Sequence, residues 1–278
     1  MKKVAIDLFA CSGGFSHGWI QGGGEIAVAV DSWGVALANH AFNHPNVPIL
    51  KRELGHDLEA ISQELRTYLP SDEEFHFHLH GSPPCQAIST ASNHDAEEGM
   101  RLVNWFLALV AYMKPDSWSM ENVVPVAKRL PDGIPYVELN AADFGVPQMR
   151  KRIFAGSGWS VKRTHIPRDY FRVSDVLDMK GIDRIVSRRR KKGETPQFYS
   201  PFAPAHTITQ CNHMLERLLP DGTYDVVRSL NIGELATLQG WSDMRFMPGI
   251  GMTFATKKEM VANMVCPPIA KAICEGIL

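Results

Sequence analysis

In this 278-residue chain, one cysteine in a rigid turn is the side chain best placed to act as a reactive group. Cys85 lies in the segment Gly81-Ser-Pro-Pro-Cys-Gln-Ala-Ile-Ser89, directly after an apolar run and behind two prolines. Proline fixes φ and restricts the residue before it, so the chain ahead of the thiol has little freedom. A thiol held in this way suits nucleophilic catalysis. The alternative is a tight turn with an incidental buried cysteine.

A glycine-containing turn near the N-terminus is the second chemical feature. The apolar run Val4–Phe9 leads into Cys11-Ser-Gly-Gly14, and a second apolar run ends at Asp31. Glycine lets a backbone approach a ligand, and an acidic residue after the second strand can accept hydrogen bonds from ribose hydroxyls. The turn contains neither GxGxxG nor a phosphate-binding P-loop. It therefore suits a cofactor with an adenosine and no phosphates, such as S-adenosylmethionine, or it is an ordinary α/β turn.

Alternating short apolar runs and helical patterns must position these residues. The pattern predicts an α/β fold with a doubly wound, mostly parallel sheet and helices on both faces. Polar and acidic residues follow the strand ends, which is where open parallel sheets bind ligands. Strands are predicted at 4–9, 26–30, 75–80, 117–123 and 135–139, and helices at 15–21, 34–43, 58–69, 102–113, 231–239 and 257–277.

The bulk composition excludes several classes of protein. Hydrophobic residues make up 45% and charged residues 21%, which is ordinary for a globular chain, and the net charge of -1 predicts that any basic binding surface is local. Five scattered cysteines without a CxxC pattern indicate a reducing compartment. We expect no signal peptide, no membrane span and a cytoplasmic location.

A change in pattern after Trp159 predicts a second, smaller part. The stretch of about 160–205 is basic and irregular, and its run of five cations is a candidate for phosphate contacts or a solvated loop. We expect a catalytic and cofactor-binding domain at 1–159 and 242–278, and a small recognition region at 160–241. The five cations are Arg188, Arg189, Arg190, Lys191 and Lys192.

Six segments in order resemble the DNA cytosine C5-methyltransferase family. The resemblance covers nearly the whole chain except roughly 160–205. The segments are Asp7-Leu-Phe-Ala-Cys-Ser-Gly-Gly14, Gly81–Ser89, Glu121-Asn-Val123, Leu139–Arg152, Arg228–Trp241 and Ala262-Asn-Met-Val-Cys-Pro-Pro268. The resemblance implies a Rossmann-like methyltransferase fold and transfer of a methyl group from S-adenosyl-L-methionine to carbon 5 of cytosine in double-stranded DNA. S-adenosyl-L-homocysteine is then the product, and we expect a monomer associated with the nucleoid.

The same resemblance assigns roles to the catalytic residues. Cys85 would attack C6 of a flipped-out cytosine, which turns C5 into a nucleophile. Glu121 would donate a proton at N3. Arg152 would hydrogen-bond O2 of the base, and Arg150 would support the same pocket; solvated surface charge is the alternative for both arginines. Gln86, Ser89 and Gln148 are expected to contact DNA.

The cofactor residues implied by the resemblance fall into three groups. They are Phe9, Gly13 and Gly14 at the first loop, Asp31 at the ribose with Asp57 and Leu58 at the adenine edge, and Pro84, Leu102 and Asn263 at the methionine end. The sequence departs from the family at Cys11, where the family usually has glycine.

The recognition region is shorter than the family usually has. Few side chains remain for base readout in the major groove, so we expect a short or relaxed target sequence. His76, His78 and His80 alternate along a predicted strand and are expected to form a polar face near its end, without a metal. Two other functions stay open: a transfer-RNA cytosine-5 methyltransferase on the same scaffold, and a non-catalytic DNA-binding module derived from it.

Overall fold

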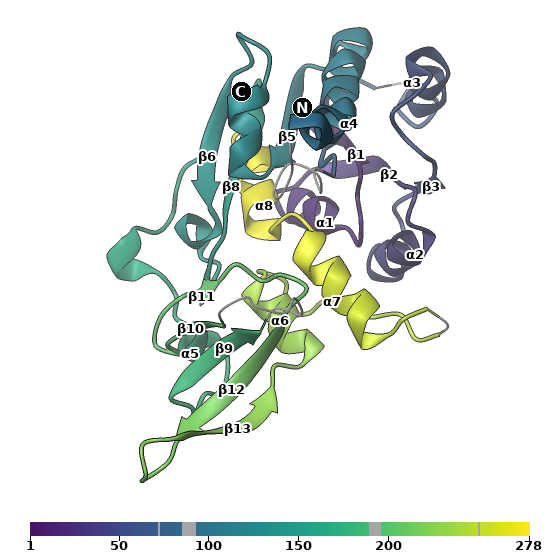
Figure 1. The fold of residues 1–278 in the computed structure, drawn as a ribbon. Helices are drawn as coiled ribbons and strands as arrows, with labels where there is room; N and C mark the ends of the chain where they lie inside the picture. The colour runs from purple at the N-terminus through teal and green to yellow at the C-terminus, as the bar shows by residue number, and fades with distance from the viewer. Residues whose placement is uncertain (72, 85–92, 189–195, 250) are drawn as a thin grey trace.

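A largely parallel sheet forms the upper part of the molecule (Figure 1). The computed structural model describes the chain except residues 72, 85–92, 189–195 and 250. Within these residues the sheet has seven strands in the order β3-β2-β1-β4-β5-β8-β6. Only β8 runs antiparallel to its neighbours β5 and β6. The strands are β1 (Lys2–Leu8), β2 (Glu25–Asp31), β3 (Ile49–Lys51), β4 (Phe75–Gly81), β5 (Ser117–Asn122), β6 (Tyr136–Asn140) and β8 (Lys151–Ser157).

The chain reverses its direction of travel across this sheet between β1 and β4. From β1 it passes to β2 and β3, and it then returns to β4 on the other side of β1. The carboxyl ends of β1 and β4 therefore flank the crevice in which such sheets bind ligands. β1 ends just before Phe9, and β4 ends just before Ser82.

Helices cover both faces of the sheet, which confirms the predicted doubly wound α/β fold. One apolar core joins the sheet to α3 (Leu58–Arg66) and α4 (Asn93–Met113). A second core joins the opposite face to α1 (Gly14–Gln21) and α8 (Pro267–Glu275). The helix α2 (Gly34–Asn43) packs beside β2 and β3.

Helix α1 and the start of α8 pack unusually closely because two glycines face that contact. A Cβ on Gly14 would lie 2.2 Å from the Val265 carbonyl oxygen, and a Cβ on Gly18 would lie 2.0 Å from that of Pro267. Both positions therefore require glycine. This contact ties the first loop of the chain to its last helices.

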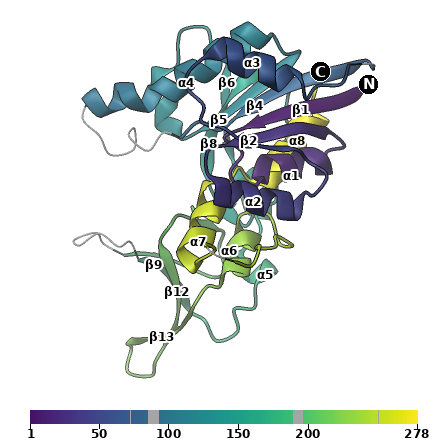
Figure 2. The ribbon, with the colours of Figure 1, turned by 90° about the vertical axis from the view of Figure 1, so that its right-hand side faces the viewer.

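The lower part is built on an antiparallel sheet (Figure 2), and two of its four strands lie in the stretch of about 160–205 that we expected to be irregular. Ile185 and Leu215 lie opposite each other on neighbouring strands and are both fully buried in the lower core, and this pairing joins residues that are distant in sequence. The strands are β9 (Arg184–Arg188), β10 (Gln197–Tyr199), β12 (Asn212–Leu218) and β13 (Tyr224–Ser229), in the order β10-β9-β12-β13. Short pieces β7 (Gln148–Met149) and β11 (Ala205–His206) pair beside it.

The lower core extends from the sheet into neighbouring helices. It takes apolar residues from α5 (Val173–Val176), α6 (Ile232–Leu238) and α7 (Phe254–Asn263). Helix α7 then leads to α8 in the upper part, so the last helices join the two parts. Short 3-10 turns complete the connections: η1 (Val124–Arg129), η2 (Ala141–Phe144) and η3 (Pro167–Asp169).

Candidate active site

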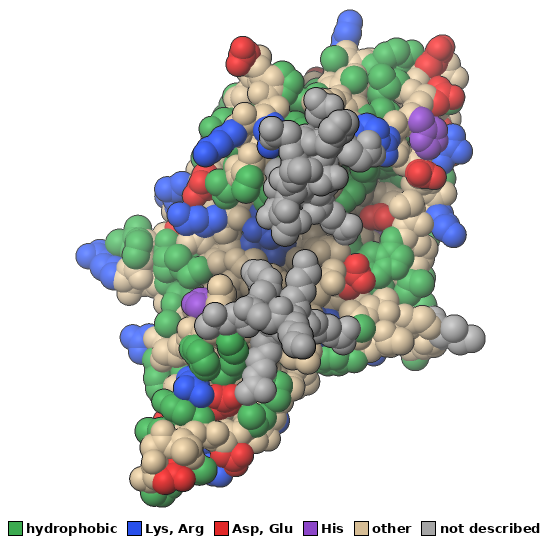
Figure 3. All heavy atoms as spheres, in the orientation of Figure 1, with side chains coloured by type: hydrophobic (Ala, Val, Ile, Leu, Met, Phe, Trp, Pro, Cys, Tyr) green, Lys and Arg blue, Asp and Glu red, His purple; other side chains and the backbone are tan. Residues whose placement is uncertain are grey.

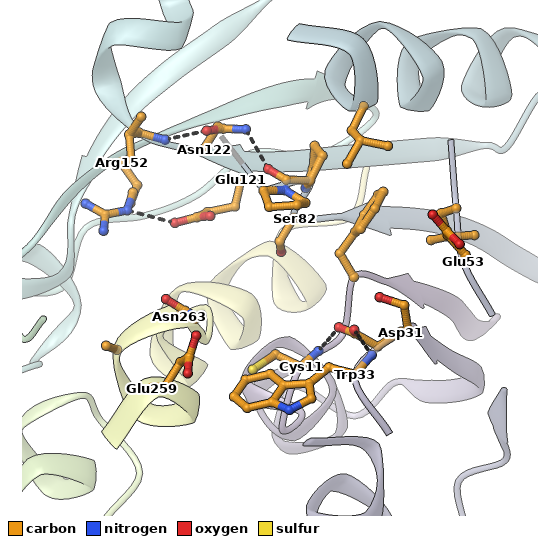
Figure 4. A pocket seen from close by; sticks show the side chains of 18 of the residues that line it. Cys11, Asp31, Trp33, Glu53, Ser82, Glu121, Asn122, Arg152, Glu259 and Asn263 are labelled. Atoms are coloured by element: carbon orange, nitrogen blue, oxygen red, sulfur yellow. Dashed lines mark hydrogen bonds and ion pairs between the residues drawn. The ribbon is translucent and has the colours of Figure 1, made fainter. Parts of the chain in front are cut away.

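A cavity of about 520 Å³ opens at the carboxyl ends of β1, β2, β4 and β5. Residues of α7 close it from the lower part, so the cavity lies where the two parts meet (Figure 4). A basic side chain is visible in the hollow between the two parts (Figure 3). The place and size of the cavity suit a small-molecule ligand.

Glu121 and Arg152 form an ion pair on one wall of this cavity. Arg152 Nε lies 3.1 Å from Glu121 Oε1, and the two side chains are only 18% and 11% exposed. Glu121 is near the end of β5, and Arg152 is near the start of the adjacent antiparallel strand β8. A shielded pair of this kind fixes the carboxyl group in one position facing the cavity.

Arg150 also lines the cavity but serves the protein interior. Its Nη2 donates to the Ala262 carbonyl at 2.9 Å, and its Nη1 donates to the Ile208 carbonyl at 3.3 Å. Burial, and then the charge of Arg152, lower the pKa of Arg150 to about 10. Arg150, which lies between β7 and β8, therefore joins this connection to α7.

The opposite wall combines aromatic surface with a carboxylate. Asp31 Oδ2 accepts from the Cys11 N–H and Oδ1 accepts from the Trp33 N–H, both at 2.8 Å. Burial raises the pKa of Asp31 above its ordinary value. Phe9 and Trp33 both line the cavity with this carboxylate, and Trp33 lies next to Asp31 and Cys11 (Figure 4). The wall offers apolar rings and a hydrogen-bond acceptor, as a nucleoside requires.

The loop after β1 is strained and tightly packed. Cys11 has φ +50°, a left-handed conformation that favours glycine, and its buried thiol points to the Met260 carbonyl at 3.8 Å. Burial raises the pKa of this thiol to about 12. Gly13 and Gly14 do not line the cavity; side chains there would meet His40 at 2.6 Å and Val265 at 2.2 Å. The glycines thus shape the loop through packing.

Asp57 and Leu58, which we predicted at the adenine edge, lie outside the cavity lining. Asp57 caps α3 by accepting a hydrogen bond from the Ala60 N–H at 3.1 Å. Glu53 and Leu54 line the cavity in their place. Both sets offer an acidic residue followed by leucine, so the sequence pattern alone did not separate them.

Gln148 corrects a second prediction. Its side chain is fully buried, and its amide donates to the Leu238 carbonyl at 2.9 Å and to Gln239 Oε1 at 2.7 Å. Its Oε1 accepts from the Ile208 N–H at 2.8 Å. Every polar atom of this side chain is used inside the protein, so a direct DNA contact is contradicted by this arrangement.

Several predicted residues lie outside the described residues. Among them are Cys85, Gln86 and Ser89, together with Arg189, Arg190, Lys191 and Lys192. Arg188 is the last residue of β9. Of the other predictions, Pro84, Leu102 and Asn263 all line the cavity with Phe9 and Asp31.

Several polar or aromatic residues that line the cavity were not among the site residues we predicted, and Trp33, Ser82, Glu259 and Arg52 are four of them. Trp33 follows Asp31 by two positions, and Ser82 directly precedes Pro83, so both were near residues we had chosen. Glu259 lies one helical turn before Asn263, a spacing that could have indicated it. Arg52 carried no sequence signal.

The three histidines of β4 form the polar face that we expected near the strand end, and this face is buried. His78 and His80 are fully buried and His76 is 7% exposed, because Phe15 and Trp19 of α1 stack on this face of the sheet. Within the part of the chain that is described, no group of three or more His, Cys, Asp or Glu could hold a metal ion. No helix among the described residues is both long and apolar enough to span a bilayer.

The doubly wound sheet, with its carboxylate–arginine pair and nucleoside-like wall, defines a methyltransferase-type α/β protein. Residues 4–129 match the family of C-5 cytosine-specific DNA methylases. The chain is 34% identical to the Type II methyltransferase M.HgiDI of Herpetosiphon aurantiacus, over 94% of this chain and 89% of that protein. The chain therefore belongs to the C-5 cytosine-specific DNA methylase family, which confirms the predicted resemblance and enzyme class.

Two further comparisons agree in sequence and in fold. The chain is 31% identical to the Type II methyltransferase M.DdeI of Desulfomicrobium norvegicum over 54% of its length, and it spans 39% of that protein. The methyltransferase EhMeth of Entamoeba histolytica has the same fold, with a TM-score of 0.69, 15% identity and coverage of 99% and 97% of the two chains.

Proposed function

We propose that this protein transfers a methyl group from S-adenosylmethionine to carbon 5 of cytosine in double-stranded DNA. The observation that carries the proposal is the shielded Glu121–Arg152 pair, which faces a cavity of nucleoside size below the Pro83–Pro84 turn. Family membership supports action on DNA. We further propose that the enzyme acts as a monomer in the cytoplasm, at the nucleoid.

The residues present fit S-adenosylmethionine. Phe9, Trp33 and Leu54 supply apolar surface for an adenine ring, and each Asp31 oxygen keeps acceptor capacity beyond its one backbone bond. Glu53 would meet the adenine edge or ribose, with Pro84, Leu102 and Asn263 toward the methionine end. When bound, the cofactor supplies an electrophilic methyl group on a sulfonium.

The protein's residues would make the cytosine reactive. The Cys85 thiolate adds to C6 of the extruded base, and electron density moves toward N3 and C5. The Glu121 carboxyl group holds a proton at N3, which stabilises that electron density. Arg152 holds Glu121 in position and faces O2 of the base. When the C5 proton leaves, the electrons of that bond form the C5–C6 double bond and the thiolate is expelled.

Covalent trapping tests this mechanism at Cys85. Duplex DNA with 5-fluorocytosine at the target has no C5 proton to lose, so the wild-type adduct should persist in denaturing gels. Cys85→Ser should form no adduct and should bind cofactor within about threefold of the wild type, because a thiolate is the required nucleophile. Methyl transfer by Cys85→Ser at the wild-type rate would remove Cys85 from the mechanism.

The nucleic acid and the target length can be tested together. We expect labelled methyl groups from the cofactor to enter duplex DNA and not transfer RNA. Bisulfite sequencing of the DNA product should show a short or relaxed target, because the lower sheet provides few strands for base readout. Preferential labelling of transfer RNA would favour the alternative substrate, and labelling of neither would favour a non-catalytic DNA-binding module. Strict methylation of a site of six or more base pairs would contradict the short target.

A further inference from the structure

A continuous row of hydrogen bonds runs along β4 and β5 to the cavity. The row alternates imidazole and hydroxyl groups, and each link is between 2.7 and 3.0 Å long. Its members, in spatial order, are His76, Ser117, His78, Ser119, His80 and Ser82. We call this set the His–Ser row.

The strand register creates the row. In the parallel pairing of β4 with β5, His78 lies opposite Ser117 and His80 lies opposite Ser119. Residues two apart on a strand share a face, so both sets of side chains point to the same side of the sheet. Each of the two β5 hydroxyls then bridges two imidazoles. Phe15 from α1 covers the row and stacks on His80 with ring centroids 3.6 Å apart.

All hydrogen bonds of the row must point in the same direction. A serine hydroxyl has one proton, so between two imidazole nitrogens it donates to one and accepts from the other. Each neutral imidazole likewise donates from one nitrogen and accepts at the other, so all the bonds point the same way along the row. Burial keeps the imidazoles neutral by lowering the pKa of His78 to about 3 and that of His80 well below its ordinary value. Ser119 therefore takes one ring nitrogen of His80, and the other ring nitrogen is left for the hydrogen bond to Ser82.

Ser82 is the point where the row reaches the cavity. His80 Nε2 lies 3.0 Å from Ser82 Oγ, and the Ser82 N–H donates to the Leu8 carbonyl of β1 at 3.1 Å. The next residue is held as well, because Asn122 Nδ2 donates to the Pro83 carbonyl at 3.1 Å. Ser82, Pro83 and Pro84 all line the cavity, and the chain continues from there to Cys85.

We infer that Ser82 and His80 are positioning residues that fix the Ser82–Pro84 wall of the cavity, where the chain enters the segment bearing the nucleophile. The inference rests on the proposed function of Cys85. The proline φ angles are already restricted, so the position of this wall depends on how its first residue is anchored. Loss of the anchor should reduce the fraction of molecules in the reactive geometry, and thereby slow the chemical step.

The test measures the single-turnover rate of adduct formation with 5-fluorocytosine duplex DNA and S-adenosylmethionine in the full-length protein. Ser82→Ala and His80→Phe should slow adduct formation by roughly 10- to 100-fold. The dissociation constants for S-adenosylhomocysteine and for DNA should stay within about threefold of the wild type, since a wall shift of this size acts on the chemical step. Ser82→Thr keeps the hydroxyl and should recover most of the rate. His76→Phe makes the same chemical change at the far end of the row and should have little effect.

The outcomes separate this inference from the proposed function. A wild-type protein that forms no adduct would refute the proposed function and, with it, this inference. A wild-type protein that forms the adduct while Ser82→Ala matches its rate would overturn the inference alone. Equal losses in His76→Phe and His80→Phe, or losses confined to ligand affinity, would show a general packing role and would also overturn it. Should His80→Phe fail to fold, the half-buried Ser82→Ala and Ser82→Thr pair decides the question.

Discussion

Replacing Glu121 with glutamine should lower kcat for DNA methylation by about 10²- to 10⁴-fold. Glutamine keeps the shape of the side chain and can still accept a hydrogen bond from Arg152, which lies 3.1 Å away. It has no acidic proton to place at N3 of the base, so only the acid–base contribution is lost. Steady-state kinetics should show the change in kcat, and calorimetric titration with S-adenosylhomocysteine should show cofactor affinity within about threefold of the wild type.

A matched control exists on the edge strand β6 of the same sheet. Glu138 of β6 pairs with Lys151 at 3.3 Å and is exposed outside the cavity. Glu138→Gln makes the same chemical change to an ion-paired carboxylate and should leave kcat unchanged. A Glu121→Gln enzyme with near wild-type kcat would show that the carboxyl proton is not used.

The folded protein should lose stability steeply as the pH falls from about 6.5 toward 4.5. Burial lowers the pKa of five buried histidines, to about 3 or about 4 in four of them and well below 6.5 in the fifth. They are His40, His44, His78, His80 and His213. On unfolding below pH 6.5, each binds a proton that the folded state excludes, which costs about 1.4 kcal/mol of stability per pH unit.

Two carboxyl groups, those of Asp7 and Asp31, act in the opposite direction because burial raises the pKa of each. Burial raises the pKa of Asp7 to about 7, so its contribution is present at low pH and is lost as the pH rises through that value. The net slope near pH 5 should therefore be about 5 kcal/mol per pH unit. A fall of two pH units would then remove a free energy of unfolding comparable to the whole stability of a typical domain. Urea unfolding at pH 7.5, 6.5, 5.5 and 5.0 measures this slope.

Single histidine variants identify the source of that slope. His213→Gln should reduce this slope by about 1.4 kcal/mol per pH unit, which corresponds to one proton. The reason is that His213 is 2% exposed and its pKa is lowered to about 4. His56→Asn replaces an exposed histidine and serves as the control for the substitution itself. A stability that stays flat between pH 6.5 and 5.0 would contradict the neutral, buried state of these rings.

The sequence predicted the upper sheet well because its strands and helices are local patterns. The helix at 34–43 has the predicted bounds, and β4 extends only one residue beyond its predicted end. Polar and glycine residues after β1, β2 and β4 correctly indicated the position of the cavity. The catalytic assignments remain predictions, although Glu121, Arg150 and Arg152 are brought together as the motifs indicated.

Long-range packing explains what the sequence did not predict. Whether Asp57 or Glu53 faces the cavity depends on how the loop after β3 packs, and no local pattern records that. Gln148 is buried because α6 and β11 arrive from later in the chain to take its hydrogen bonds. The histidines of β4 are buried because Phe15 and Trp19 of α1 stack on them, and the serines of β5 take their hydrogen bonds. Each correction concerns a partner distant in sequence.

The way the chain closes the cavity has a consequence for how the protein is made. Phe9 and Asp31 come from the first strands, whereas Glu259 and Asn263 come from α7, more than two hundred residues later. Contacts of such long sequence separation form late in folding, because the ordering of the intervening chain must come first. On the ribosome, the first strands emerge well before α7 and remain without it for seconds at ordinary synthesis rates. A nascent chain therefore lacks this wall of the cavity until its synthesis has passed α7.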